Sequence, residues 1–544
     1  MESEIKALMQ KGNQYLKAQN LSDAKKYYLE VISKTDTESE AFYGLGWISY
    51  KEQKTEEACD YLSKACSLEP LNKNYLQGLS EIYLQLGELQ AATKLFQVYL
   101  KEKPTDIDIY LKYAFTLAKN KETDLSIQAL KQCIKLNPKE LAPYMNLGEL
   151  FYHLMQYREA QVVYNDALKN DLKSEGLYKN IAKLHIDFGE LDQAKAVLET
   201  AIKCFPDSLV FPYRLSSLDN KVLSPELFNK LSHQDPNSAA LDKQFYHYWL
   251  LSKYAEKEYE PILEMEYLAK AHEVYIKTTA FPYDANHYLK ELKHASSTVK
   301  ENFEPLRNVQ QSEESPIFIV GVPRCGSTLI ENIICSGPEQ IIKGEESSVI
   351  SHVVMGNIGK DGSDFWSNFQ NQSNENFQKC GLLKENVRFT DKSLENIFLI
   401  DFILALYPKA KIIYCERIPL ASIVSILKNN MVSLPWAHKL EDILQYVENS
   451  INAIEKYTEE YPSSIYKIKY EDLVTNPEDE SKKLMEFCDL EWNESCLSFH
   501  NKNDLISKTA SHIQIRKKIN QNSLYHYKSY EPFFFNAKQQ YAWL

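Results

Sequence analysis

Arginine is scarce in this sequence of 544 residues, in which only seven of the 62 basic residues are arginine. Because lysine is used almost everywhere else, each arginine is a candidate for planar, bidentate binding of an anion. Chance retention is enough to explain the first two, Arg158 and Arg214. The search for an anion site therefore concentrates on the other five, which are Arg307, Arg324, Arg388, Arg417 and Arg516.

Long hydrophobic runs are also missing. One of the longest, "IFLIDFILAL" at residues 397–406, is interrupted by Asp401. A membrane span needs roughly 18 apolar residues. The first residues, "MESEIKALMQK", lack the apolar segment of a secretory signal. We therefore expect a cytoplasmic protein without a membrane span.

Metal-binding cysteine pairs and an excess of positive charge are absent as well. The ten cysteines include no Cys-x-x-Cys pair and no His–Cys cluster of zinc spacing. This pattern predicts reduced thiols used as small core residues, and no metal site. The net charge of −13 argues against nucleic acid or an anionic membrane as a general partner.

A period of 34 residues runs through residues 1–208, in six windows that begin at residues 5, 39, 73, 107, 141 and 175. The eighth position is always small, with Gly12, Gly46, Ser80, Ala114, Gly148 and Ala182. Position 20 is also small, with Ala24, Ala58, Ala92, Ser126, Ala160 and Ala194. Position 24 is bulky, with Tyr28, Leu62, Phe96, Leu130, Tyr164 and Leu198.

Small residues at two positions let paired helices approach closely, and proline at position 32 of four windows ends the second helix of a pair. This pattern resembles the tetratricopeptide repeat. The resemblance implies an α-solenoid of six repeats, whose concave groove binds an extended peptide or a partner protein. The alternative is that the array only supports the rest of the chain, or joins two copies of it as a homodimer.

The chain changes character twice after the repeats. Residues 209–310 lose the period but keep apolar residues at helical spacing, which predicts a helical extension and linker. The polar stretch "NVQQSEESP", residues 308–316, ends in proline and predicts a domain boundary. Residues 311–544 form the second domain. Its short β-rich runs, "PIFIVGV", "KIIYC" and "SIYKIKY", alternate with helical stretches, which indicates a parallel sheet between two layers of helices.

The first of these strands leads into "GVPRCGST", residues 321–328, which we call the anion loop. A glycine-containing turn between a strand and a helix directs several backbone N–H groups, and the positive end of the helix dipole, toward one anion. A Walker loop would have lysine where this chain has Ser327. Arg324 supplies positive charge from inside the loop instead.

The anion loop and several later blocks resemble sulfotransferases whose donor is 3′-phosphoadenylyl sulfate. The likeness is to bacterial fusions of tetratricopeptide repeats with a sulfotransferase and, in the second half, to tyrosylprotein sulfotransferases. It implies an α-solenoid followed by a P-loop-like α/β sulfotransferase domain with a parallel sheet. The later blocks are "KGEESS" (343–348), "TDKSLEN" (390–396), "CERIPLASIVS" (415–425), "KYEDLVTNP" (469–477) and "KTASHIQIRKK" (508–518).

The resemblance also implies a role for each donor-binding residue. The loop residues that would hold the 5′-phosphosulfate are Arg324, Cys325, Gly326, Ser327 and Thr328. The 3′-phosphate would bind Arg417 and Ser425, and Tyr470 would pack near the nucleotide. Arg516 and Lys517 would close over the donor.

Two further residues are implied to take part in catalysis. Glu345 follows Arg324 by 21 residues, where the general base is expected, and Lys392 matches the lysine at the sulfate and the leaving group. Glu346 is the adjacent alternative base, and His352 is a rival. The moving sulfuryl group has less negative charge than a phosphoryl group, so magnesium is dispensable and no metal is expected.

The chain departs from the family pattern at two of these blocks. Cys325 replaces the usual serine of the anion loop, at the cost of one hydroxyl contact. Ile418 stands where relatives often have aspartate, which puts the electrostatics of the following helix start in doubt.

These observations predict a sulfotransferase that moves a sulfuryl group from 3′-phosphoadenylyl sulfate to a hydroxyl acceptor, either a protein or peptide bound in the repeat groove or a glycan. Two other classes of protein stay open. One is an inactive tetratricopeptide scaffold with a vestigial nucleotide site. The other is a P-loop kinase, which the missing lysine argues against.

Overall fold

The computed structural model describes residues 2–279, 314–357, 365–501 and 517–544. The chain divides into two compact units, Met1–Leu184 and His185–Leu544. The division lies before residue 208, the predicted end of the repeats. The helix α12 (Leu191–Cys204) therefore belongs to the second unit, where it packs against α13 (Val210–Ser216). Most of the predicted linker boundary, residues 308–316, lies outside the described residues.

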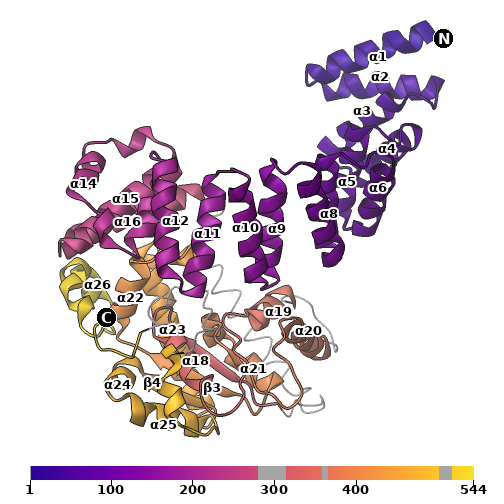
Figure 1. The fold of residues 1–544 in the computed structure, drawn as a ribbon. Coiled ribbons are helices and arrows are strands. Elements are labelled where there is room, and N and C mark those ends of the chain that lie inside the picture. The colour runs from indigo at the N-terminus through magenta and orange to yellow at the C-terminus, as the bar shows by residue number, and fades with distance from the viewer. Residues whose placement is uncertain (1, 280–313, 358–364, 502–516) are drawn as a thin grey trace. The chain divides into compact units, whose positions relative to one another are not determined.

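The first unit is a stack of antiparallel helix pairs (Figure 1). Five helices begin on the first residue of a predicted window, at residues 39, 73, 107, 141 and 175, so the period is also the spacing of the hairpins. The helices are α1 (Glu2–Lys17), α2 (Leu21–Lys34), α3 (Ser39–Lys51), α4 (Thr55–Leu68), α5 (Lys73–Leu86), α6 (Leu89–Glu102), α7 (Ile107–Lys119), α8 (Thr123–Leu136), α9 (Leu141–His153), α10 (Tyr157–Lys169) and α11 (Glu175–Phe188), which extends into the second unit.

The small and bulky positions of the repeat contact each other inside each pair. A Cβ atom on Gly148 would lie 2.2 Å from the Tyr164 ring, and one on Gly46 would lie 2.6 Å from Leu62. Both distances are too short for any side chain but hydrogen. The eighth residue is therefore small because the bulky residue at position 24 packs directly against its backbone.

The second unit contains a four-stranded parallel sheet of order β2-β1-β3-β4. Its strands are β1 (Ile317–Gly321), β2 (Thr390–Asp391), β3 (Lys411–Glu416) and β4 (Ile465–Lys469). Three of them confirm the predicted strands, and β2 was not predicted. The helices before the sheet are α12, α13, α14 (Pro225–Ser232), α15 (Leu241–Lys257) and α16 (Pro261–Thr278).

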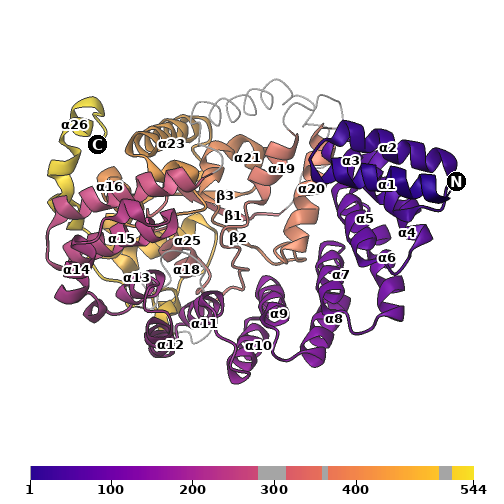
Figure 2. The same ribbon diagram turned by 90° about the horizontal axis from the view of Figure 1, so that it is seen from above.

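The helices that follow β1 cover both faces of the sheet. Phe318 and Val320 contribute to one core and Ile317 and Ile319 to the other, as expected of a strand buried on two sides. The first core includes residues of α19 (Val349–Asn357), α20 (Phe365–Lys379), α21 (Ile400–Leu406), α22 (Pro419–Leu427) and α23 (Leu440–Glu460). The second includes residues of α18 (Ser327–Ile334), α24 (Tyr470–Thr475) and α25 (Pro477–Phe487). Figure 2 shows the strands between α21 and α23 on one side and α18 and α25 on the other.

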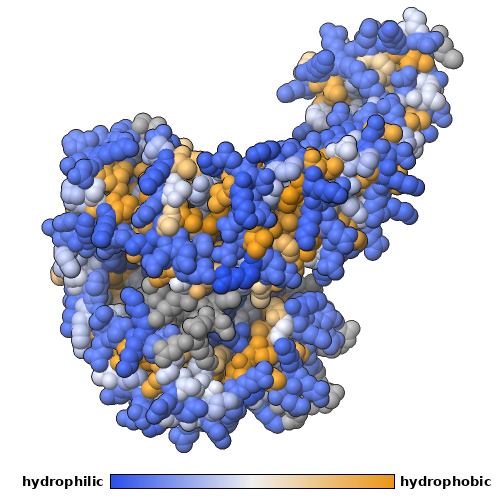
Figure 3. Space-filling model, viewed as in Figure 1, coloured by the Kyte–Doolittle hydropathy of each residue, from blue (hydrophilic) through white to orange (hydrophobic). Residues whose placement is uncertain are grey.

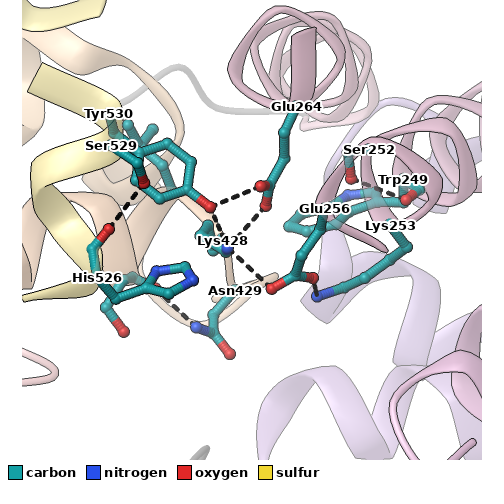
Figure 4. A network of polar contacts seen from close by, with 12 residues as sticks. Trp249, Ser252, Lys253, Glu256, Glu264, Lys428, Asn429, His526, Ser529 and Tyr530 are labelled. Carbon is teal, nitrogen blue, oxygen red and sulfur yellow. Dashed lines mark hydrogen bonds and ion pairs between the residues drawn. The ribbon is translucent and has the colours of Figure 1, made fainter. Parts of the chain in front are cut away.

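A network of charged side chains joins α15 and α16 to the helices around the sheet (Figure 4). The ammonium of Lys428, just after α22, lies 2.8 Å from Glu256 and 2.9 Å from Glu264. It also donates to the hydroxyl of Tyr530, which in turn donates to Glu264 at 2.7 Å. Tyr530 belongs to the 3-10 helix η9 (His526–Phe534), so three segments far apart in the sequence meet here.

A pair of buried histidines strengthens the same attachment. The Nδ1 atoms of His272, on α16, and His438 lie 2.9 Å apart, and Nε2 of His272 lies 2.9 Å from the carbonyl oxygen of Leu427. The helical extension is therefore an integral part of the second unit.

In the described part of the chain, no helix is long and apolar enough to cross a membrane. On the face shown in Figure 3, hydrophilic residues predominate and hydrophobic residues form smaller areas.

Candidate active site

Predicted site residues of the second domain follow each of the four strands. Lys392 directly follows β2, the anion loop follows β1, Arg417 directly follows β3 and Tyr470 directly follows β4. Because parallel strands end at the same edge of a sheet, four segments that are distant in the sequence meet there. Ligands of open α/β sheets bind at this edge.

The anion loop makes a tight turn at the N-terminus of α18. Arg324 and Gly326 both adopt positive φ, at 70° and 107°. Ser327 and Thr328 are the first two residues of the helix, and both are nearly buried. Because α18 begins at these residues, the positive end of its dipole lies near the ends of the strands.

Arg324 and Arg417 are held next to each other. Nη1 of Arg417 donates to the carbonyl oxygen of Arg324 at 2.6 Å, and Nε of Arg324 donates to the Ser425 hydroxyl at 3.0 Å. Burial and the nearby Arg417 lower the pKa of Arg324 to about 10, so its guanidinium is still charged at neutral pH. Nε of Arg417 is buried and has no hydrogen-bond partner among the described residues. Two adjacent cations with an unused donor fit a ligand with several negative charges.

Tyr470 packs against both parts of this cationic cluster. Its ring centroid lies 4.6 Å from the Arg417 guanidinium, and a Cβ atom on Gly326 would lie 2.4 Å from the ring. Gly326 is therefore needed both for its positive φ and for the close approach of the ring. The Tyr470 hydroxyl also lies 2.8 Å from Ser523 Oγ.

The side chain of Cys325 is fully packed in the second core of the sheet. Its N–H donates to the carbonyl oxygen of Val322 at 3.1 Å, and the thiol of Cys415 donates to its carbonyl oxygen at 3.0 Å. The replacement of serine by cysteine therefore fits a buried position.

The start of α22 has the acidic partner that its own sequence lacks. Glu471, at the start of α24, accepts a hydrogen bond from the Ile418 N–H at 3.1 Å. The sequence block around Ile418 gave no indication of this contact, because the carboxylate comes from a different strand end.

Residues 344–348 form a second strained turn, which we call the base loop because it contains the predicted base. Glu345 and Ser348 have φ of 49° and 52°, an unfavourable region for non-glycine residues. A Cβ atom on Gly344 would lie 1.9 Å from the Thr390 carbonyl oxygen, so only glycine fits. The Lys392 N–H donates to the Glu345 carbonyl oxygen at 2.7 Å and joins the loop to the end of β2.

The ammonium of Lys392 contacts Glu346. The Nζ–Oε1 distance is 2.8 Å, and the lysine side chain is only 1% exposed whereas that of Glu346 is 57% exposed. Burial acts to lower the pKa of Lys392, but the carboxylates of Glu331, Glu346 and Glu345 outweigh it and raise the pKa. Glu345 Oε1 lies 3.8 Å from Nζ of Lys343. Both glutamates therefore lie beside cations, and Lys392 stays charged.

Two buried acids at this site were not found from the sequence. Glu331 on α18 is fully buried and accepts hydrogen bonds from the Glu345 N–H at 3.0 Å and from the Thr390 hydroxyl at 2.9 Å. Asp391 is also fully buried, and burial raises its pKa to about 6. An apolar helix that contains one glutamate was the only sequence signal for Glu331.

The last three predicted residues are either exposed or outside the described residues. Arg516 lies outside the described residues, and Lys517 is exposed. His352, the rival base, is exposed on α19.

Comparison with known proteins agrees with the sequence patterns. The model of a sulfotransferase family matches residues 360–494, which include Lys392, Arg417, Ser425 and Tyr470. Tetratricopeptide-repeat models match residues 9–72, 107–140 and 176–208.

Three relatives illustrate the range of similarity. An uncharacterized protein of Aquifex aeolicus is 23% identical over 93% of this chain and 70% of its own length. Protein-tyrosine sulfotransferase A of Caenorhabditis elegans is 26% identical over 45% of this chain and 69% of its own length. Human protein O-mannosyl-transferase TMTC1 is 22% identical over 39% of this chain, which spans only 24% of that protein.

Among solved structures, a tetratricopeptide repeat protein from Parabacteroides merdae covers 50% of this chain and 93% of its own, with 16% identity and a TM-score of 0.31. The family models account for both parts of the chain, and their order matches the observed fold. The chain therefore contains matches to tetratricopeptide-repeat models followed by a match to a sulfotransferase family model.

Proposed function

We propose that the chain transfers a sulfuryl group from 3′-phosphoadenylyl sulfate to a hydroxyl acceptor. The observation that supports it most is the meeting of Lys392, the anion loop, Arg417 and Tyr470 at the carboxyl edge of one sheet. Each of these residues matches a block of the family pattern, and most of the last block, residues 508–518, lies outside the described residues.

The cationic cluster suits the donor's phosphate groups. The anion loop and the start of α18 would hold the 5′-phosphosulfate, and Arg417 with Ser425 would bind the 3′-phosphate. The buried Nε of Arg417, which has no partner among the described residues, fits a phosphate oxygen. The Tyr470 ring, stacked on the same guanidinium, would lie beside the nucleotide.

Lys392 and the base loop suit the transfer itself. In this step the bond between sulfur and the bridging oxygen of the donor breaks, and a bond forms between sulfur and the acceptor oxygen. Lys392 would stabilise the negative charge that develops on the leaving phosphate oxygen. Glu345 would take the proton of the acceptor hydroxyl as the new bond forms. Glu346 would instead hold Lys392 through its 2.8 Å ion pair.

The repeats are proposed to bind the acceptor or the protein that carries it. Stacked repeats of this class present an extended surface for a peptide or partner protein. A hydroxyl on a protein, a peptide or a glycan would each satisfy the chemistry at Glu345.

Thermal unfolding with candidate nucleotides tests the proposal. Stabilisation by adenosine 3′,5′-bisphosphate in the absence of magnesium is the expected result, because a ligand that binds only the folded state raises its stability. Stabilisation only by ATP with magnesium would indicate a kinase, and no response to either would indicate an inactive scaffold. Incubating a lysate with the donor and the chain, followed by mass spectrometry for a gain of one SO3 group, would identify the acceptor.

A further inference from the structure

We propose that Glu331 and Thr390 act as positioning residues for the transfer step, by holding the base loop and Lys392 against the anion loop. The inference rests on the proposed sulfuryl transfer for its kinetic part. Its structural part is independent of the reaction.

Glu331 lies on the helix that begins at the anion loop. It follows Ser327 by four residues, so the two lie on the same side of α18, roughly 6 Å apart along its axis. The side chain is fully buried. A carboxylate in this position can connect the helix of the anion loop to a neighbouring segment of the chain.

What it binds is the backbone of the base loop. Oε1 of Glu331 accepts from the Glu345 N–H at 3.0 Å and from the Thr390 hydroxyl at 2.9 Å. The same Thr390 oxygen accepts from the Gly344 N–H at 3.1 Å. Two consecutive amides, including that of the proposed base, are therefore bound by one glutamate–threonine pair.

The loop needs this support because its conformation is costly. Glu345 has φ of 49° without being glycine, and such conformations persist only where the surroundings hold them. Gly344 already approaches the Thr390 carbonyl as closely as hydrogen allows. Without the two acceptors, the loop would lose the contacts that direct the Glu345 side chain.

The charge of Glu331 has a second use. A glutamine could accept the same two hydrogen bonds, so hydrogen bonding alone does not explain a fully buried carboxylate. Oε2 of Glu331 is buried and has no hydrogen-bond partner among the described residues. Glu331 is one of three carboxylates, with Glu346 and Glu345, that favour the charged form of Lys392. The buried carboxylate therefore helps to keep a buried lysine protonated for the leaving group.

Three variants of the full chain separate these uses. In Glu331→Gln the hydrogen bonds remain but the charge is lost, and we expect kcat to fall roughly tenfold or more. We also expect the alkaline limit of its activity to move to a lower pH, by about one unit or more, because the charged form of Lys392 is less stabilised. In Thr390→Val the hydroxyl is lost and the charge remains, so kcat should fall without that shift. Thr390→Ser should restore kcat.

Asp401→Asn is the matched control. Asp401 is another buried acid of the second unit, and it accepts from the Tyr461 hydroxyl at 2.8 Å. It should change stability without changing the alkaline limit or the affinity for adenosine 3′,5′-bisphosphate. If Asp401→Asn shifts the alkaline limit as much as Glu331→Gln does, or if neither Glu331→Gln nor Thr390→Val slows turnover, the proposal is wrong.

Hydrogen exchange keeps the inference separate from the proposed function. The Gly344 and Glu345 amides should exchange slowly in the wild-type chain and faster in Thr390→Val, whether or not any acceptor is sulfated. Equal exchange in both chains would overturn the positioning role. A wild-type chain that transfers no sulfuryl group, yet shows the exchange difference, would overturn only the proposed reaction.

Discussion

The site has two halves that use positive charge differently. The proposed donor half, consisting of the anion loop, Arg417, Ser425 and Tyr470, places two arginines together, with one guanidinium hydrogen-bonded to the backbone of the other. The proposed acceptor half, consisting of the base loop, Glu331, Asp391 and Lys392, surrounds a single buried lysine with carboxylates. Arginine is suited to binding phosphate oxygens in fixed geometry, whereas a lysine ammonium acts as a compact charge.

This difference predicts that substitutions in the two halves have different kinetic effects. Changes in the donor half should weaken nucleotide binding, and changes in the acceptor half should slow turnover of bound donor. The predictions below test that separation, in order of decreasing expected effect.

Replacing the proposed base should give the largest loss. Glu345→Gln keeps the shape of the side chain but cannot accept a proton, so kcat should fall roughly 100-fold or more. Affinity for adenosine 3′,5′-bisphosphate should stay near the wild-type value, as measured by calorimetry. Glu346→Gln is the control, and it should cost much less because Glu346 contacts Lys392 from an exposed position. If the Glu346 variant is the inactive one, the two glutamates exchange roles.

Replacing Arg417 by alanine should weaken binding of adenosine 3′,5′-bisphosphate by about 2 kcal/mol, because charged hydrogen bonds to the 3′-phosphate are lost. Affinity for adenosine 5′-phosphosulfate, which lacks that phosphate, should change little. Calorimetry with both nucleotides measures the difference. Equal losses of affinity for the two nucleotides would place Arg417 at the 5′ end of the donor. The 5′-phosphosulfate and the 3′-phosphate would then not have separate binding residues.

The acceptor half should also show a dependence of stability on pH that the donor half lacks. Burial raises the pKa of Asp391 to about 6, so the folded state binds its proton more tightly than the unfolded state does. The resulting stabilisation is complete below about pH 4 and is lost as the pH rises through about 6, by up to about 1.4 kcal/mol per unit. Urea unfolding of Asp391→Asn should lack this decline. Parallel curves for the two proteins would mean that Asp391 does not titrate in this range.

Removing the first unit should have the smallest effect on the donor half. A chain that starts at residue 185 keeps the whole of the second compact unit, so its affinity for adenosine 3′,5′-bisphosphate should match that of the full chain. The KM for the natural acceptor should rise if the repeats bind it. An unchanged KM would give the repeats a different purpose.

Much of the fold could be predicted because its signals are local. Each repeat window contains the residues that pack against one another, as Gly148 and Tyr164 do across 16 residues. The predicted strands are short runs rich in β-branched and aromatic residues, and the residues after them lie at the sheet edge by the topology of parallel strands. The anion loop and Arg417 could be located in this way, whereas Lys392, which follows the unpredicted β2, and Tyr470 were located by the family resemblance.

The support of the site could not be predicted, because it depends on contacts without a sequence pattern. Glu331 and Thr390 are separated by 59 residues, and Lys392 and Glu346 by 46. The strand β2 has only two residues, too few for any alternation of apolar and polar positions to appear. A single glutamate in an apolar helix indicates that something binds it, but not which backbone amide.

The network around Lys428 has a consequence for how the chain is made. Glu264 and Tyr530, which are hydrogen-bonded in the folded protein, are 266 residues apart. At about 5 to 20 residues per second, a ribosome needs roughly 13 to 50 seconds to synthesise the chain between them. During that time α15 and α16 have emerged, but the segments that bury Glu264 and Trp249 are incomplete. The second unit therefore closes only near the end of translation, and until then this surface is open to chaperones.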